Sequence, residues 1–232
     1  LYANVDGFTG REAEVPVARR PEIDRWIVSL LNTLVADVTA SLEGYDPTPA
    51  ARMIQEFVCE NLSNWYVRLN RKRFWGGGMT EDKLAAYQTL YTCLETVASL
   101  SAPFAPFISE RIFRDLNAVS GRHEGSVHLA QFPDPSLADK ELEETMSLAQ
   151  RVSSMVLALR RKVNIKVRQP LGKILIPVLD PAMGRHIEAV RPLIMNEVNV
   201  KRIELVAETA GLITKRIKPN FKTLGPKYGK YM

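Results

Sequence analysis

The chain has 232 residues, a formal net charge of +5, 46% hydrophobic residues and 25% charged residues. These values match an ordinary globular protein with one large domain or two small ones. No run of about eighteen apolar residues is present and no basic-then-apolar segment opens the chain, so neither a membrane span nor a secretory signal is expected. The chain opens on Leu1 instead of Met, which we interpret as a piece of a longer protein.

Side chains with catalytic or metal-binding potential are sparse. Cys59 and Cys93 form no CxxC pair and the three histidines have no ligand spacing, so no metal site is expected. Both cysteines fall at apolar helix positions, which predicts buried thiols in a reducing compartment. The sequence lacks a Gly-x-Ser-x-Gly elbow, a Gly-x-x-x-x-Gly-Lys loop and a Gly-x-Gly-x-x-Gly turn after a strand. Taken alone, the chain is not predicted to be a catalyst.

The first third of the chain predicts a lead-in and two long helices. Residues 1–20 contain glycines, prolines and an Arg-Arg-Pro stop, and we interpret them as an extended lead-in. From Glu22, apolar residues recur with a 3.6-residue period over about five turns. The sequence GYDPTP breaks this helix, after which Thr48 can cap the second helix and Pro49 suits its first turn. The second helix is expected to end at Gly76–Gly78, where glycine can supply a left-handed residue.

Three further helices complete a predicted bundle. Thr80 caps the third, which ends or kinks at Pro103 and Pro106 because proline cannot donate a backbone hydrogen bond. A short fourth helix precedes a loop at Asn117–Pro135 that contains one extended piece, SVHLAQF. Short connections between long amphipathic helices indicate an antiparallel bundle. The fifth helix runs from about Ala138, and its inward apolar residues are expected to be Leu142, Met146, Ala149, Val152, Val156, Leu159 and Val163.

After Asn164 the pattern changes to strands. KILIPVL and VKRIELV are strand candidates on either side of a helix at Arg185–Glu197, and LITKRIKPN is a further extended piece. A β-α-β unit of this size is a small appendage and not a second full core. The predicted fold is therefore mainly α, with an antiparallel helical bundle over residues 21–165 and a small α+β junction domain over residues 166–232.

The segment NWYVRLNRKRFWGGGM places four cations and four aromatic residues before three glycines. On a regular helix, side chains spaced four, three and four residues apart would share a stripe of about 80° beside the apolar face. Here these side chains are Asn64, Arg68, Arg71 and Trp75. Arginine can bury its stem and fork onto phosphate, and both arginine and tryptophan can stack on splayed bases. The stripe predicts a surface for unpaired RNA.

Other residues of this segment have simpler interpretations. Trp65 and Phe74 are predicted to be core aromatics, and Trp75 fits a core position and an RNA surface equally well. Lys72 and Arg73 point to other sides of the helix, where they can simply be solvated. Lys72 is kept among the candidate RNA contacts.

Two further groups of basic residues follow. Arg151–Lys173 contains seven basic residues and no acid, and Ala207–Met232 contains six basic residues and one acid. A segregated basic surface favours a polyanionic partner. The alternative is a solvated face whose countercharges lie elsewhere in the fold.

Several stretches closely resemble isoleucyl-tRNA synthetases: DRWIVSLLNTLV, LSNWYVRLNRKRFW, LETVASLSAPFAPFISERIF, VNIKVRQPLGKILIPV and KRIKPNFKTLGPKYGK. The resemblance covers essentially the whole chain. The Trp-Tyr-Val-Arg segment alone would also fit valyl enzymes, but the pairing of NIKVRQPL with IKPNFKTLGPKYGK favours the isoleucyl branch. The family's HIGH and KMSKS signatures are absent. The chain therefore resembles the anticodon-binding region and the start of the junction domain that follow those signatures.

The resemblance implies a parent enzyme that activates isoleucine with ATP and Mg, charges its tRNA and edits valine in a separate inserted domain. It implies that this chain is a non-catalytic module without a cofactor, joined to the remainder of a monomeric, cytoplasmic synthetase. Some members of the family carry a cysteine-rich zinc module at the C-terminus. The sequence leaves open whether the parent has one.

The resemblance also gives the later basic residues an RNA role. Lys162, Lys166 and Arg168 are expected either to touch the anticodon stem or to brace the two predicted domains. Further along, Lys215, Lys218 and Lys222 either contact tRNA or belong to a strand and turn of the junction domain. Two other functions stay open: a helical interaction module that binds an acidic protein partner, and a free-standing RNA-binding protein.

Overall fold

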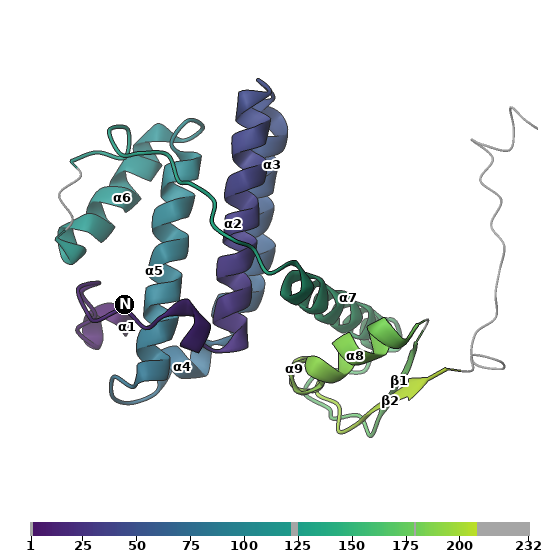
Figure 1. Cartoon of the computed structure of the whole chain (residues 1–232). Helices are drawn as coiled ribbons and strands as arrows, with labels where there is room; N and C mark the ends of the chain where they lie inside the picture. The colour runs from purple at the N-terminus through teal and green to yellow at the C-terminus, as the bar shows by residue number, and fades with distance from the viewer. Residues whose placement is uncertain (1, 122–124, 179, 208–232) are drawn as a thin grey trace, which may run out of the picture. The chain divides into compact units, whose positions relative to one another are not determined.

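The computed structural model describes residues 2–121, 125–178 and 180–207 (Figure 1). It is mainly helical with a small two-stranded parallel sheet, as the sequence predicts. The chain divides into two compact units, Leu1–Met146 and Ser147–Met232. This division falls inside a helix, so the domain limits at residues 20 and 165 stay predictions. Among the described residues, no helix is long and apolar enough to cross a membrane.

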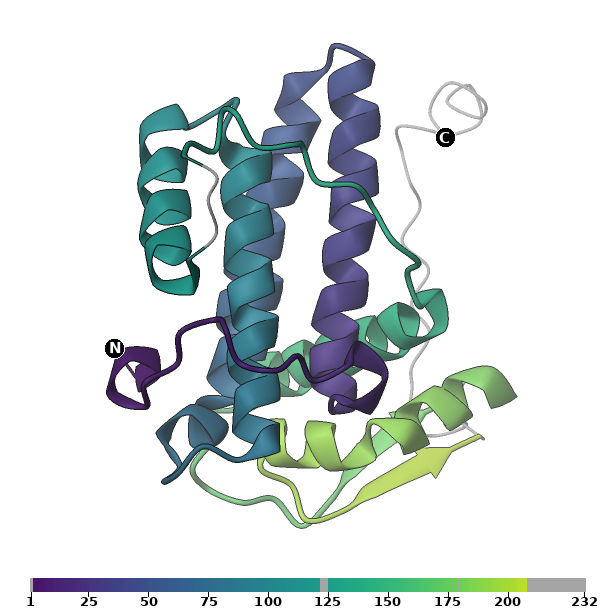
Figure 2. The same cartoon turned by 60° about the vertical axis from the view of Figure 1, so that its left-hand side comes forward.

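A helical bundle forms most of the first unit. α2 (Glu22–Glu43) packs against α3 (Pro47–Glu56) and its continuation η2 (Phe57–Val67). α5 (Glu81–Ser101) packs against α2 and against α6 (Pro106–Ser120). Figures 1 and 2 show α2, α3 and α5 side by side, and the turn between α2 and α3 is short. The predicted antiparallel bundle is confirmed.

The core of this unit is built on the apolar stripe of α2. Trp26, Ile27 and Val38 are buried on that stripe, which faces η2 and α5. Removing such side chains from water contributes about 25 cal/mol per Å² of apolar surface, which is the main force holding the helices together. Phe113 of α6 and Val127 belong to a smaller buried cluster beside it.

Two predicted helix caps have different outcomes. Thr80 caps α5 as predicted, since its side chain accepts a hydrogen bond from the backbone N–H of Lys83. The prediction that Thr48 caps the second helix is wrong. α3 begins earlier, at Pro47, and the preceding Asp46 forms no side-chain cap bond. Proline fits this first turn because the N–H that it lacks has no partner there.

The second predicted helix is not regular. After α3 the backbone becomes π-helical over η2, turns at Asn70, and resumes as the short α4 (Arg71–Trp75). A π-helix bonds residues five apart, so successive side chains rotate by less than in an α-helix. Cys59 lies on η2 and is exposed, against the prediction, whereas Cys93 on α5 is buried as predicted. The expected left-handed glycine after α4 is Gly78, with φ of 70°.

The chain after α6 forms a turn where the sequence predicted an extended piece. The Glu110 carboxylate accepts hydrogen bonds from the Val127 N–H and the Ser126 hydroxyl, both at 2.9 Å. The bond from the Val127 N–H is the main reason that the pKa of Glu110 lies below its ordinary value. A side-chain acceptor thus satisfies this backbone without a neighbouring strand, so the turn forms.

The lead-in contains two short helices, α1 (Tyr2–Val5) and η1 (Val17–Arg19), with irregular chain between them. Arg20, directly after η1, is buried. Its guanidinium donates to the Val15 carbonyl at 2.8 Å and to the Thr89 hydroxyl at 3.0 Å. These bonds fix the end of the lead-in to α5 before α2 begins.

α7 (Lys140–Lys162) contributes residues to both units. Its first turn is tied to α2, because the Glu143 carboxylate accepts hydrogen bonds from the hydroxyls of two α2 residues. Its end contradicts the predicted inward face: Leu159 in the last turn is 62% exposed, and Val163, one residue after the helix, is 63% exposed. Arg160 takes the inward position and is 3% exposed. A guanidinium can occupy that position because four backbone carbonyls accept its hydrogen bonds.

The second unit is a β-α-β arrangement, as predicted. β1 (Ile174–Pro177) and β2 (Ile203–Val206) pair in parallel. α8 (Pro181–Ala189) and α9 (Arg191–Val198) connect them, where the sequence predicted one helix. The break falls at Val190, shortly before a proline, which fits the start of a helix better than its interior. The predicted extended piece LITKRIKPN lies outside the described residues.

Candidate nucleic-acid interface

The first group of predicted RNA contacts is divided between η2 and α4. Asn64 is exposed on η2, and Arg68 is half-buried just after it. Arg71 and Lys72 are exposed on α4, and Trp75 at its end is 58% exposed. The assumed rotation of 100° per residue does not hold across the π-helix and the turn that follows it. The group is therefore not one stripe of a single regular helix.

The aromatic residues of this segment separate into core and surface. Trp65 and Phe74 are buried, which confirms the prediction, and Tyr66 is buried with them. Trp75 is at the surface, with its ring centroid 6.1 Å from that of Tyr2 in α1. Of the four aromatic side chains, Trp75 is the one placed to stack on a partner.

Asn64 and Arg68 are linked along η2. The Nε of Arg68 donates to the Asn64 carbonyl at 2.7 Å. The Asn64 amide donates to the Glu60 carboxylate at 3.4 Å. These bonds orient both side chains along the helix and restrict the rotamers that they can present.

Arg73 anchors α4, so its interpretation as a solvated cation is wrong. Its guanidinium pairs with the Asp24 carboxylate of α2 at two points, Nη1 to Oδ1 at 2.7 Å and Nη2 to Oδ2 at 2.9 Å. Its Nε donates to the Asp82 carboxylate at 2.9 Å. Asp24 is 0% exposed, and a buried charge of this kind requires a paired partner.

The hydroxyl of Tyr66 completes this network by donating to Asp24 at 2.8 Å. Burial, reinforced by the charge of Asp24, raises the pKa of Tyr66 well above its ordinary value, so the hydroxyl stays a donor. Burial opposes the charge on Arg73, but its bonds to Asp24 and Asp82 outweigh this and raise its pKa. At neutral pH the Tyr66 hydroxyl therefore stays a donor and Arg73 stays a cation.

Lys83 of α5 forms a second anchor, at the end of α4. Its Nζ donates to the Gly76 carbonyl at 2.6 Å and pairs with the Asp6 carboxylate of the lead-in. A cation is favoured near the carbonyl end of a helix. The bonds from Lys83 and then from the Tyr87 hydroxyl hold the pKa of Asp6 below its ordinary value.

These two anchors leave the outer side of α4 with unpaired positive charge. Neither Arg71 nor Lys72 has an ion-pair partner in the part of the chain that the structure describes. Trp75 is exposed on the same short helix. Free cations beside an exposed indole can bind phosphate and stack on a base.

The second group of predicted contacts lies in the second unit. Lys162, Lys166 and Arg168 are all exposed, and none has an ion pair among the described residues. Other members of that basic stretch are compensated within the fold: Arg160 is buried, and Lys173 pairs with Glu204 at 2.8 Å. The third predicted group lies outside the described residues; it comprises Lys215, Lys218 and Lys222.

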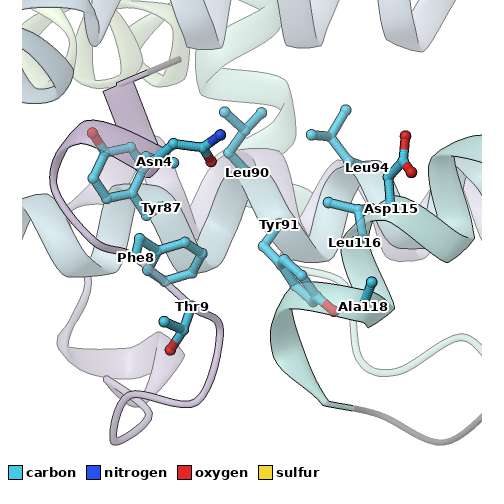
Figure 3. A pocket seen from close by; sticks show the side chains of 11 residues that line it. Asn4, Phe8, Thr9, Tyr87, Leu90, Tyr91, Leu94, Asp115, Leu116 and Ala118 are labelled. Carbon is cyan, nitrogen blue, oxygen red and sulfur yellow. The ribbon is translucent and has the colours of Figure 1, made fainter.

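The lead-in, α5 and α6 line a pocket of about 550 Å³ (Figure 3). Phe8 and Tyr87 stack in its wall with ring centroids 5.3 Å apart. Asp115 at the pocket pairs with Arg111. None of the predicted RNA contacts lines this pocket, and its apolar wall presents no pair of nucleophile and base. In the described ranges, no group of three or more His, Cys, Asp or Glu could hold a metal ion.

Comparison with known proteins identifies the bundle. Residues 24–175 match the family described as the anticodon-binding domain of tRNA ligase. The chain belongs to this family. The matched range runs from the first turn of α2 into β1, so the family's domain includes α4 and the exposed turn at residues 166–169 that follows α7.

The chain is also similar over nearly its whole length to isoleucine–tRNA ligases. Identity is 63% with the protein of Bacteroides fragilis and 60% with that of Porphyromonas gingivalis, each over 100% of this chain. Identity is 40% with the Thermus thermophilus protein over 99% of this chain. The chain spans about a fifth of these relatives, namely 21%, 20% and 22% of their lengths. The resemblance to isoleucyl-tRNA synthetases is confirmed.

The sequence did not predict the buried charged residues that position the candidate RNA contacts. Amphipathic patterns assign charges to the outside, whereas Asp24, Lys83 and Arg160 are buried. Asp24 did leave a signal, because it interrupts the apolar stripe of α2 two residues before Trp26. Arg160 left none, since its partners are backbone carbonyls, which every sequence has.

Proposed function

We propose that the chain is the tRNA anticodon stem-loop binding module of an isoleucyl-tRNA synthetase. The family match over residues 24–175 carries this proposal, and the similarity to isoleucine–tRNA ligases selects the isoleucyl branch. These comparisons do not favour an acidic protein partner or a valyl enzyme.

The exposed cations and the exposed indole of Trp75 support the RNA role. Phosphate contacts would supply affinity and orientation, and stacked or hydrogen-bonded bases would supply identity. The proposed contacts in the first unit are Asn64, Arg68, Arg71, Lys72 and Trp75. Those in the second unit are Lys162, Lys166 and Arg168, together with Lys215, Lys218 and Lys222 beyond the described residues.

For the whole protein we propose ATP-dependent ligation of isoleucine to its tRNA, with editing of valine, by a cytoplasmic monomer. ATP and Mg do not fit the glycine run of this chain. Gly76–Gly78 follows a helix, and the Gly76 carbonyl accepts a hydrogen bond from Lys83. A phosphate loop instead presents N–H groups between a strand and a helix. We therefore assign ATP and Mg to other parts of the whole protein.

Binding of the chain to isoleucine tRNA and to a tRNA with an unrelated anticodon, each at two salt concentrations, tests the proposal. Tighter, salt-sensitive binding to the isoleucine tRNA is the expected result. Equal binding to both would contradict anticodon recognition and leave a basic surface. Binding to neither would contradict RNA binding by the isolated chain, and an acidic protein partner would be tested next.

A further inference from the structure

The turn after α7, hereafter the basic turn (Lys166–Gln169), is held from one side by two long side chains. Arg160 Nη1 donates to the carbonyls of the first and last residues of the turn, at 3.1 and 3.0 Å. Asn199 Nδ2 donates to the two carbonyls between them, at 2.8 and 3.2 Å. Four consecutive carbonyls therefore all point toward two donors, although the turn itself is exposed.

This arrangement determines where the N–H groups of the turn point. In a trans peptide the C=O and N–H of one unit point in opposite directions. Because the carbonyls of Lys166 and Val167 face the donors, the N–H groups of Val167 and Arg168 face away from them. Neither N–H has an acceptor within the described residues. Adjacent outward N–H groups form a concave site for an anion.

Arg160 adds a positive charge beneath the turn. Its guanidinium is 3% exposed, and its other two hydrogen bonds also go to carbonyls, those of Val198 and Asn199 at 2.9 and 3.0 Å. No carboxylate pairs with it in the described part of the chain. Carbonyl dipoles stabilise this cation but leave its net charge uncompensated, so the field outside the turn favours an anion.

We propose that the basic turn is a phosphate-binding site for the backbone of the bound RNA. The N–H groups of Val167 and Arg168 donate to phosphate oxygens, and the side chains of Lys166 and Arg168 supply positive charge. Arg160 and Asn199 are positioning residues that never touch the RNA. Bonds to an ionised acceptor are about twice as strong as neutral ones, and a turn already held in place loses little entropy on binding. The RNA part of this inference rests on the proposed function.

The test follows the backbone N–H resonances of Val167 and Arg168 by NMR while the full chain is titrated with inorganic phosphate or with an isoleucine tRNA anticodon stem-loop. Both resonances are expected to shift with each titrant. Asn199 has φ of 50°, a conformation that glycine adopts readily, so Asn199→Gly removes the amide without straining the backbone. In this variant the two shifts are expected to disappear and RNA affinity to fall by about tenfold.

Arg160→Met and Arg161→Met form a matched pair, because each removes one positive charge from neighbouring residues of α7. Arg161 is exposed, and its side chain has no hydrogen bond or ion pair among the described residues. Arg161→Met should keep both N–H shifts and lower the salt slope by at most about 0.7. Arg160→Met should lower the salt slope and should also abolish the shifts of both N–H resonances. If Arg160→Met does not fold, Asn199→Gly decides the question.

RNA binding without a shift of Val167 and Arg168 would overturn this inference, as would wild-type shifts and affinity in folded Asn199→Gly. Shifts with inorganic phosphate but no binding of RNA would support the phosphate site and contradict the proposed function. No response to either titrant would overturn both.

Discussion

Asp24 has no exposed surface, yet Arg73 and Tyr66 bond to it as a carboxylate. Transferring an isolated carboxylate into the bundle would be far more costly than any single contact could offset. The two-point pair with Arg73 offsets part of that cost and at the same time fixes α4 to α2. One pair of residues therefore stabilises the fold and sets the position of the proposed RNA surface.

Arg73→Ala should lower the free energy of unfolding by about 3–5 kcal/mol, because it leaves Asp24 buried without its partner. Arg71→Ala on the same short helix is the matched control and should change it by at most about 0.5 kcal/mol. Urea denaturation followed by circular dichroism measures both. Equal stability of the two variants would show that the Asp24 pair does not anchor α4.

The two cysteines should differ in reactivity. Burial, with the charge of Asp24 adding to it, raises the pKa of Cys93 from 9.0 to about 12, whereas Cys59 is exposed. Because the pKa of Cys93 is higher in the folded chain, the buried thiol contributes fully to the free energy of unfolding below about pH 9. This contribution is lost as the pH rises toward 12.

At pH 8 a thiol reagent should therefore label Cys59 quickly and Cys93 only after denaturant is added. Cys59→Ser is the control and should abolish the fast phase. Fast labelling of both thiols in the native chain would contradict the burial of Cys93.

At the scale of elements, the π-helical η2 separates residues that a regular helix would align. The buried Trp65 lies on η2, and the exposed Trp75 lies on α4 beyond the turn. The two indoles are ten residues apart in a single aromatic-rich segment, yet one belongs to the core and the other to the surface. Their replacement should have separate effects.

Trp65→Ala should destabilise the bundle by about 3–5 kcal/mol, because it leaves a cavity in the core. Trp75→Ala should cost less than about 1 kcal/mol, since its ring is mostly in water. Thermal unfolding of the two variants measures this difference. A larger loss for Trp75→Ala would mean that its contact with Tyr2 outweighs the burial of Trp65.

Two arginines of this region lead to a binding prediction. Arg68→Ala and Arg71→Ala should each weaken binding of the anticodon loop by about 1–3 kcal/mol and leave the fold intact. Fluorescence anisotropy with a labelled stem-loop measures the loss, and circular dichroism checks the fold. If Arg68→Ala unfolds the domain and binding per folded molecule is unchanged, Arg68 is structural and not an RNA contact.

At the scale of the whole molecule, unpaired cations lie in both compact units. If the chain meets four to six phosphates, log affinity should fall against log salt with a slope of about −3 to −4, at roughly −0.7 per contact with a single strand. Titrations over a range of KCl concentrations give this slope. A slope near zero would contradict a phosphate-dominated interface.

Much of the fold could be predicted from short-range patterns. The apolar period of α2 and the cap at Thr80 depend on residues close together in the chain, so the sequence carries them directly. The π-helical η2 was not predicted, because the apolar spacing of that segment also fits a regular helix, and the break at Val190 was missed although the nearby Pro192 marks it locally. The candidate RNA contacts stay predictions at the level of single residues.

By itself, the sequence determined the mainly helical fold, the β-α-β appendage and the family, because periodicity and family motifs are local properties of the chain. The tertiary structure alone decided which charges are buried. Arg73 and Arg160 look like their exposed neighbours Arg71 and Arg161 in the sequence. Their roles depend on partners that folding brings from elsewhere: the Asp24 carboxylate for Arg73, and carbonyls of the turns around it for Arg160.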